Sequence, residues 1–128
     1  MVPYKSFIRG GLQPGKAIII QGIIDTQAFE LNLHHKLGIA FHYKILFDQN
    51  VVVRNTFENG GWGMEERSGP MPFRRGEQVL VTIFCHRDHY KVFVNGEETH
   101  TYKHRFTKLE EIDVWGVSGD IQLGDVQP

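Results

Sequence analysis

The sequence predicts an all-β fold, a sandwich of two antiparallel sheets packed face to face. Short segments alternate apolar and polar residues with a period of two, as Phe29, Leu31 and Leu33 do with Glu30 and Asn32 between them. Gly and Pro separate such segments roughly every 8–12 residues, the spacing typical of a sandwich or barrel. Val, Ile, Phe and Thr outnumber strong helix formers within them, and the apolar spacing of an amphipathic helix is missing.

The predicted strands follow one another along the whole chain of 128 residues. They cover residues 17–24, 29–33, 38–44, 51–57, 77–85, 89–95, 97–103, 112–117 and 120–126. At most one short helical turn is expected, around 108–111. Because no segment has the composition of a linker, residues 1–128 are interpreted as one domain, within the range of about 100–150 residues that a single core supports.

The clearest turn is the dipeptide Asn95-Gly96. These two residue types accommodate the two positive φ angles of a type I′ turn. The sequence therefore predicts that strands 89–95 and 97–103 form an antiparallel hairpin.

Residues 38–44 should bury one face and expose the other, because side chains alternate across a strand. The apolar face carries Ile39, Phe41 and Tyr43, and the opposite face carries Ala40, His42 and Lys44. His42 is therefore expected on an outer surface that could hold a ligand.

Composition excludes two classes of partner. Fourteen Lys and Arg against fifteen Asp and Glu leave a formal charge of −1, so the chain has no overall electrostatic attraction to nucleic acid. Its apolar runs are far shorter than the about 20 residues that span a bilayer, so membrane insertion is not expected. No apolar segment near the N-terminus resembles a secretory signal, and we expect synthesis in the cytosol.

No pattern indicates catalysis. The chain lacks a Gly-x-Ser-x-Gly elbow, a P-loop and a dinucleotide fingerprint. Glu65 and Glu66 are adjacent and on a strand would point to opposite faces, so they cannot flank one scissile bond. Cys85, the single cysteine, cannot form an intrachain disulfide and lies in the apolar run VTIFC, where a thiol is usually buried and unreactive. We predict no enzyme activity and no cofactor.

The histidines give no persuasive metal site. His86, Asp88 and His89 lie close together in the sequence, but a third ligand of suitable geometry is not evident. A solvated hairpin turn is the favoured interpretation, and His34 and His35 are interpreted as loop residues. No metal is predicted.

Residues 53–67, with the sequence VRNTFENGGWGMEER, carry the most informative chemistry. Trp62 is flanked by glycines that leave its indole uncovered, and Glu65 and Arg67 should point to one face of a following strand. An aromatic ring can pack against the apolar face of a pyranose, while a carboxylate, a guanidinium, the Asn55 amide and the His42 imidazole can bind its hydroxyls. A buried tryptophan beside a surface ion pair fits the same pattern about equally well.

The run from Ile39 to Gly76 resembles the galectins. That family has a His-x-Asn-Pro-Arg strand, then Val-x-Asn, then Trp-Gly-x-Glu-x-Arg and a Pro-Phe segment; this chain has HYKILF at 42–47, VRN at 53–55, WGMEER at 62–67 and MPFRRG at 71–76. The flanking segments GGLQPGKAIIIQG, HYKVFVNGEE, YKHRF and GDIQLGDV extend the resemblance over nearly the whole chain.

The resemblance implies a single carbohydrate-recognition domain with a jelly-roll sandwich, without metal or catalysis, that binds β-galactosides in a groove on its concave sheet. It implies that His42 binds the axial 4-hydroxyl, that Asn55 and Glu65 bind the 6-hydroxyl, and that Trp62 stacks under the ring. Glu65 and Arg67 would reach toward a second sugar.

The chain departs from the family at two positions that normally read the sugar. Lys44 replaces the motif asparagine and Leu46 replaces the motif arginine. Each lost polar contact to a charged group is worth about 1.5–3 kcal/mol, and about 1.4 kcal/mol is tenfold in affinity. Lys44 could supply a donor, but a point charge does not replace a planar fork. We therefore expect weakened or altered lactose binding, and the carbohydrate-binding residues are predicted to be His42, Lys44, Asn55, Trp62, Glu65 and Arg67.

Two functional hypotheses follow. The first is a lectin for galactose-containing or related glycans and glycoproteins; the second is an interaction or structural protein on a galectin scaffold, acting through protein contacts without sugar. Cross-linking of glycans would need a second site, supplied either by a homodimer or by a longer chain. Family behaviour implies export to the extracellular space without a leader.

Overall fold

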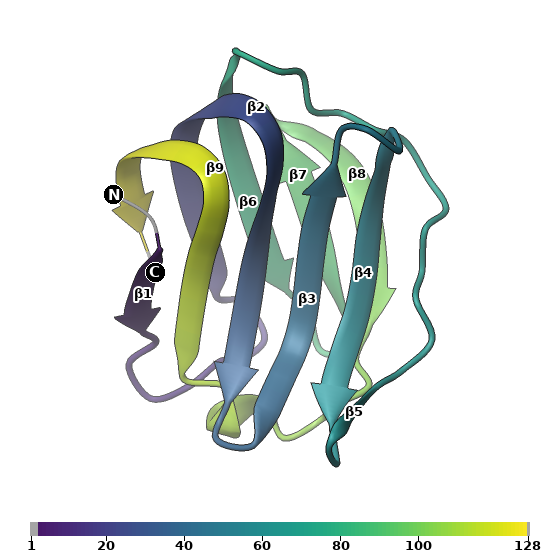
Figure 1. Ribbon diagram of the computed structural model, residues 1–128. Coiled ribbons are helices and arrows are strands. Elements are labelled where there is room, and N and C mark those ends of the chain that lie inside the picture. Colours follow the sequence, from purple (N-terminus) through teal and green to yellow (C-terminus); the bar gives the residue numbers. More distant parts are fainter. Residues whose placement is uncertain (1–2, 128) are drawn as a thin grey trace.

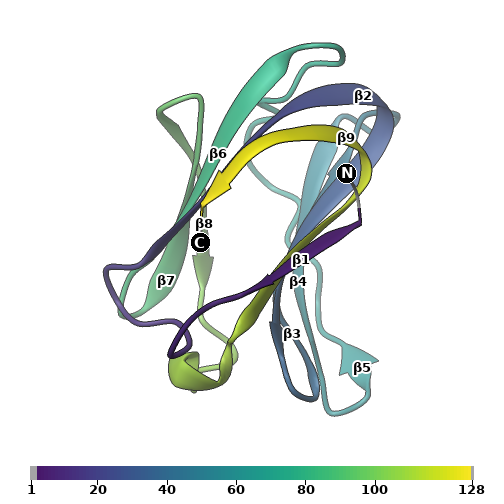
Figure 2. The ribbon, with the colours of Figure 1, turned by 90° about the vertical axis from the view of Figure 1, so that its left-hand side faces the viewer.

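Two antiparallel β layers face each other in the computed structural model, which describes residues 3–127 (Figures 1 and 2). One layer contains β3 (Gly38–Leu46), β4 (Val51–Glu58) and the short β5 (Gly61–Trp62), and the other contains β6 (Gln78–Cys85), β7 (His89–Val94) and β8 (Glu97–Lys103). The predicted all-β sandwich is confirmed.

The two layers share their longest strands. β2 (Ala17–His35) pairs through residues 17–23 with β6 and through residues 28–35 with β3. β9 (Val114–Gln127) pairs with β2 along both halves of β2. β1 (Tyr4–Phe7) pairs with the beginning of β9. Both long strands curve from one layer into the other (Figure 2).

The sequence prediction divided these long strands and missed two short ones. Segments 17–24 and 29–33 belong to one strand, and so do residues 114–117 and 120–126, because β2 and β9 bend between layers without leaving extended conformation. Residues 112 and 113, which were predicted as strand, precede β9. For the same reason His34 and His35 belong to β2 and are not loop residues. β1 and β5 were not predicted, whereas the turn near 108–111 is confirmed as the 3₁₀ helix η1 (Leu109–Glu111).

The Asn95-Gly96 hairpin is confirmed. Both residues have positive φ, 53° and 86°, and β7 pairs antiparallel with β8. Asn59 and Gly60 adopt the same pair of positive angles, 54° and 78°, and return the chain from β4 to β5. This second turn carries Trp62 back beside β4.

Aromatic side chains pack against one another within the core between the layers. Phe41 stacks on Tyr90 with ring centroids 4.6 Å apart and contacts Tyr102 at 4.8 Å. Cys85 is buried as predicted, and burial raises the pKa of its thiol to about 11, so the thiol stays protonated at neutral pH. Ala40, expected on the outer face with His42, is also buried, because the β3 and β4 register shifts between Ile39 and His42.

The long connection from β5 to β6 is tied to the sandwich by two contacts. Arg54 and Glu66 exchange backbone hydrogen bonds of 2.9 and 2.8 Å. The buried His100 donates from Nε2 to the Pro70 carbonyl at 3.0 Å and accepts the Tyr43 hydroxyl at Nδ1 at 2.8 Å. These contacts hold the segment that follows Trp62 against β4 and β8. Among the described residues, no helix has the length and apolar character needed to cross a membrane.

Candidate functional site

Strand register arranges the outer face of β2, β3 and β4 in three rows. The first row is Asn32, His42 and Asn55; the second is Glu30, Lys44 and Val53; the third is Ala28, Leu46 and Val51. Because residues two apart on a strand share a face, the β3 members of these rows all face the same side. The register therefore fixes the order of chemical groups along this surface.

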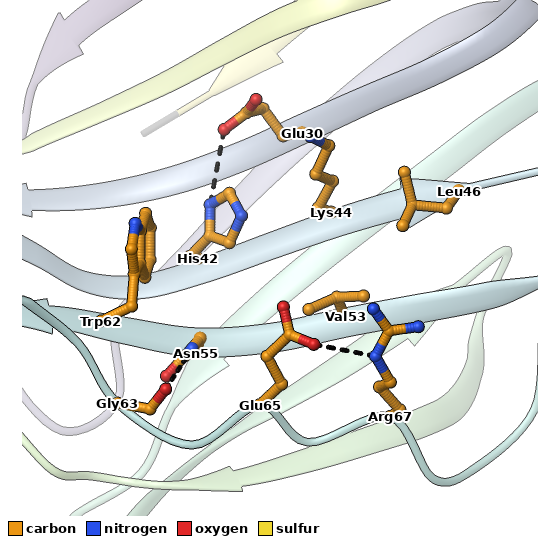
Figure 3. A pocket seen from close by; sticks show the side chains of 10 residues that line it. All are labelled: Glu30, His42, Lys44, Leu46, Val53, Asn55, Trp62, Gly63, Glu65 and Arg67. Atoms are coloured by element: carbon orange, nitrogen blue, oxygen red, sulfur yellow. Dashed lines mark hydrogen bonds and ion pairs between the residues drawn. The ribbon is translucent and has the colours of Figure 1, made fainter. Parts of the chain in front are cut away.

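A pocket of about 600 Å³ lies over these rows (Figure 3). Its wall opposite β2 is made by Trp62 and the segment after it, which runs alongside β4. The lining residues are Glu30, His42, Lys44, Leu46, Val53, Asn55, Trp62, Gly63, Glu65 and Arg67. All six site residues predicted from the sequence are among them.

Trp62 stands at one end of the pocket with its indole open. The residue is 51% exposed. Phe57, its partner in the β4–β5 pair, supports it edge-on with centroids 5.2 Å apart, and the His42 ring lies 4.7 Å away. The alternative interpretation of Trp62 as a core residue is therefore wrong, since the buried tryptophan of this chain is Trp115.

Glu65 and Arg67 lie on an extended segment that pairs with β4 through the single bridge between Arg54 and Glu66 and forms no strand, so the predicted strand there is wrong. Their side chains nevertheless meet, with Arg67 Nε donating to Glu65 Oε1 at 2.8 Å. Arg67 Nη1 also donates to Gln49 at 2.9 Å. The acid and the guanidinium are thereby held at one wall of the pocket, while Glu66 turns away from it toward Arg105.

The amide of Asn55 has a fixed orientation. Its Nδ2 donates to the Gly63 carbonyl at 2.8 Å, and its Oδ1 accepts the Thr56 backbone N–H at 2.8 Å and Arg105 Nη1 at 2.9 Å. One Nδ2 proton is left for a ligand, so Asn55 can act only as a donor there. A Cβ at Gly63 would lie 2.8 Å from Arg105 Nη1 and 3.2 Å from Asn55 Oδ1, so a side chain there would push against the hydrogen bond between them.

The imidazole of His42 is oriented by a chain of hydrogen bonds from β2. Asn32 Nδ2 donates to Glu30 Oε2 at 2.9 Å, so Asn32 Oδ1 faces His42 Nδ1 at 2.6 Å and accepts its proton. In the neutral ring, Nε2 then carries a lone pair on the side of Lys44 (Figure 3). Burial lowers the pKa of His42 below 6.5, and the opposing influence of the nearby Glu30 carboxylate, 3.4 Å from Nδ1, does not overcome it.

Sequence reasoning missed three residues that build this site. In the sequence, Glu30 and Asn32 are only the polar members of an alternating strand that precedes the His42 strand. Arg105 lies fifty positions from Asn55 and no local pattern connects the two. Only the tertiary structure brings it behind the pocket.

The histidines at the β6–β7 turn lie outside this pocket. The rings of His86 and His89 stack 4.6 Å apart at the β6–β7 turn. Within residues 3–127, no group of three or more His, Cys, Asp or Glu side chains could hold a metal ion. The pocket therefore offers an aromatic surface, a carboxylate acceptor and several oriented donors, which suit binding of a hydroxyl-bearing ring.

Comparison with known proteins supports a family assignment. The family profile described as galactoside-binding lectin matches residues 3–128. Galectin-4 of Rattus norvegicus is 39% identical over 98% of this chain and 40% of its own length, and galectin-3 of Oryctolagus cuniculus is 39% identical over 95% and 52%. The 32 kDa beta-galactoside-binding lectin of Haemonchus contortus is 34% identical over 98% and 46%. The chain thus spans about half the length of these relatives.

Solved structures agree on the fold. Galectin LEC-6 of Caenorhabditis elegans superposes with a TM-score of 0.91 at 20% identity and covers 100% of this chain and 92% of its own. Sheep galectin-11, solved in complex with glycerol, gives a TM-score of 0.89 at 23% identity and covers 98% and 95%.

Proposed function

This chain belongs to the galactoside-binding lectins, a family of sugar-binding proteins and not of enzymes, and we propose that its Trp62 pocket binds β-galactosides with a selectivity altered at Lys44 and Leu46. The single observation that carries the proposal is the open indole of Trp62 beside the paired Glu65 and Arg67. An exposed aromatic face with oriented polar groups around it matches the two surfaces of a pyranose ring.

The fixed hydrogen bonds assign a direction to each contact. Asn55 offers a donor, Glu65 an acceptor and neutral His42 an acceptor at Nε2. A galactose 6-hydroxyl would accept from Asn55 and donate to Glu65, and the axial 4-hydroxyl would donate to His42. The relatives whose names include a bound sugar, such as the Haemonchus contortus lectin, are named for β-galactosides.

The altered selectivity rests on the second and third rows. Lys44 and Leu46 line the pocket where a second sugar would reach, and Leu46 offers no hydrogen bond. Restoring the family residues with the pair Lys44→Asn and Leu46→Arg should strengthen lactose binding by roughly tenfold or more, because each polar contact to a charged group contributes about 1.5–3 kcal/mol.

Glycan-array binding of the unaltered chain and of Trp62→Ala tests the proposal. We expect binding to galactose-containing glycans that Trp62→Ala removes, while Leu37→Ala, an exposed apolar position outside the pocket, leaves it intact. No signal on any glycan would contradict the proposal. A blank array together with failure of the double restoration would favour a galectin scaffold that acts through protein contacts.

A further inference from the structure

The pocket changes from polar to apolar along its length. Its first row, next to Trp62, consists of two amides and an imidazole, whereas Leu46 in the third row lies between Ala28 and Val51 in the sheet register. In the second row, the pocket floor contributed by β4 is the buried Val53. The end of the pocket remote from Trp62 therefore has an aliphatic floor.

Four charged side chains, Glu30, Lys44, Glu65 and Arg67, surround this floor, and three of them are already engaged in hydrogen bonds within the protein. Arg67 uses Nε for Glu65 and Nη1 for Gln49. Lys44 is the other cation at this end, a flexible point charge at the β3 side of the pocket (Figure 3). A hydroxyl-bearing ring placed over Leu46 would give up hydrogen bonds to water without replacing them from below.

The pocket is long enough for this floor to matter. A ring stacked on Trp62 between His42, Asn55 and Glu65 occupies the first row. At about 600 Å³ the pocket extends beyond it, so whatever is attached to that ring lies over the second and third rows. The group next to the stacked ring thus contacts Leu46 and Val53.

We propose that this site prefers galactosides whose attached group is apolar, an alkyl or aryl aglycone, over those whose attached unit is a hydroxyl-rich hexose, and that Leu46 determines this preference. The inference rests on the proposed function and specifies its ligand class. An apolar aglycone that covers about 50 Å² of apolar surface gains about 25 cal/mol per Å². This gain corresponds to an affinity roughly eightfold higher than that of a galactoside without such a group.

The test compares four ligands by isothermal titration calorimetry. Methyl, butyl and phenyl β-galactosides and lactose are titrated into the unaltered chain, Leu46→Arg and the conservative control Leu46→Met. We expect butyl and phenyl galactosides to bind several-fold more tightly than the methyl galactoside, and lactose to bind no more tightly than the methyl galactoside. The butyl ligand separates contact with the aliphatic floor from aromatic stacking on Trp62.

Leu46→Arg should reverse the order, so that lactose gains affinity and the butyl advantage disappears, while Leu46→Met preserves it. Leu46→Gln replaces Leu46→Arg if thermal unfolding shows that the arginine variant is not folded. Binding that depends on Trp62 but favours lactose in the unaltered chain overturns this inference alone. Absence of any galactoside binding that Trp62→Ala removes overturns the proposed function and this inference with it.

Discussion

Arg105 Nη1 donates a hydrogen bond to Asn55 Oδ1 across 2.9 Å, joining the β8–η1 loop to the floor of the pocket. The same guanidinium donates from Nη2 to the Met64 carbonyl at 2.8 Å and to Glu66 Oε2 at 3.0 Å, and it lies 5.0 Å from the Tyr102 ring centre. One cation therefore fixes both the amide of Asn55 and the segment that carries Trp62.

Replacement of Arg105 by methionine should weaken galactoside binding about tenfold, although Arg105 would not touch the sugar. The loss follows because Asn55 can rotate and the segment from Trp62 to Glu66 loses two anchors, and a hydrogen bond to a charged group contributes about 1.5–3 kcal/mol. Calorimetric titration measures it, with the exposed Lys103→Met on β8 as the matched control. Arg105→Lys should recover part of the affinity, and equal affinity in all variants would contradict this positioning role.

Galactoside affinity should fall as the pH drops below 6.5. The proposed binding mode requires the neutral His42 ring, whose Nε2 would accept a hydrogen bond from a sugar hydroxyl, and burial lowers the pKa of His42. Affinity should therefore be constant above the pKa and decline as the pH falls through it. Titrations that start at about pH 8 and continue below the ordinary histidine pKa of about 6.5 would show the decline.

The Glu30 carboxylate shifts this acid transition. Glu30 favours the charged form of His42, so Glu30→Gln should move the decline to lower pH. A transition that stays at the same pH in Glu30→Gln, or affinity that rises on acidification, would contradict the assigned tautomer.

The domain should lose stability between pH 6.5 and about 4. His100 is 4% exposed, and burial lowers its pKa to about 4, so the unfolded chain binds a proton in this interval and the folded chain does not. The stabilisation is complete above pH 6.5 and is lost as the pH falls toward 4; the difference in pKa corresponds to about 3 kcal/mol.

Urea unfolding at several pH values measures this dependence. His100→Gln should remove a large part of it, while a smaller part from His34 and His104, whose pKa values are also lowered by burial, remains. An unchanged pH dependence in His100→Gln would mean that the buried ring is not the group responsible.

Strand positions and much of the pocket could be predicted from the sequence because both depend on local order. Alternation placed His42 on an outer face, and the glycines around Trp62 indicated an open indole, which the 51% exposure bears out. The bends of β2 and β9 were not predictable from the sequence, because each strand crosses from one layer to the other without interrupting its extended conformation. The burial of Ala40 follows from a register shift that alternation does not encode.

Contacts between distant segments account for the rest. Arg105 reaches Asn55 only after the β8–η1 loop packs behind β4. The apolar third row exists because register sets Ala28, Leu46 and Val51 side by side, although they come from three different strands. Such alignments depend on pairing partners, which no single segment specifies.

A nitrogen-15 NMR titration of the two tryptophan side chains would show whether a galactoside ring packs on the Trp62 indole. Trp62 is open to the pocket, whereas Trp115 is 1% exposed and serves as an internal control. We predict that phenyl or butyl β-galactoside shifts the indole N–H signal of Trp62 saturably and leaves that of Trp115 unchanged. A Trp62 signal that does not move at any galactoside concentration would contradict the packing of a galactoside ring on this indole.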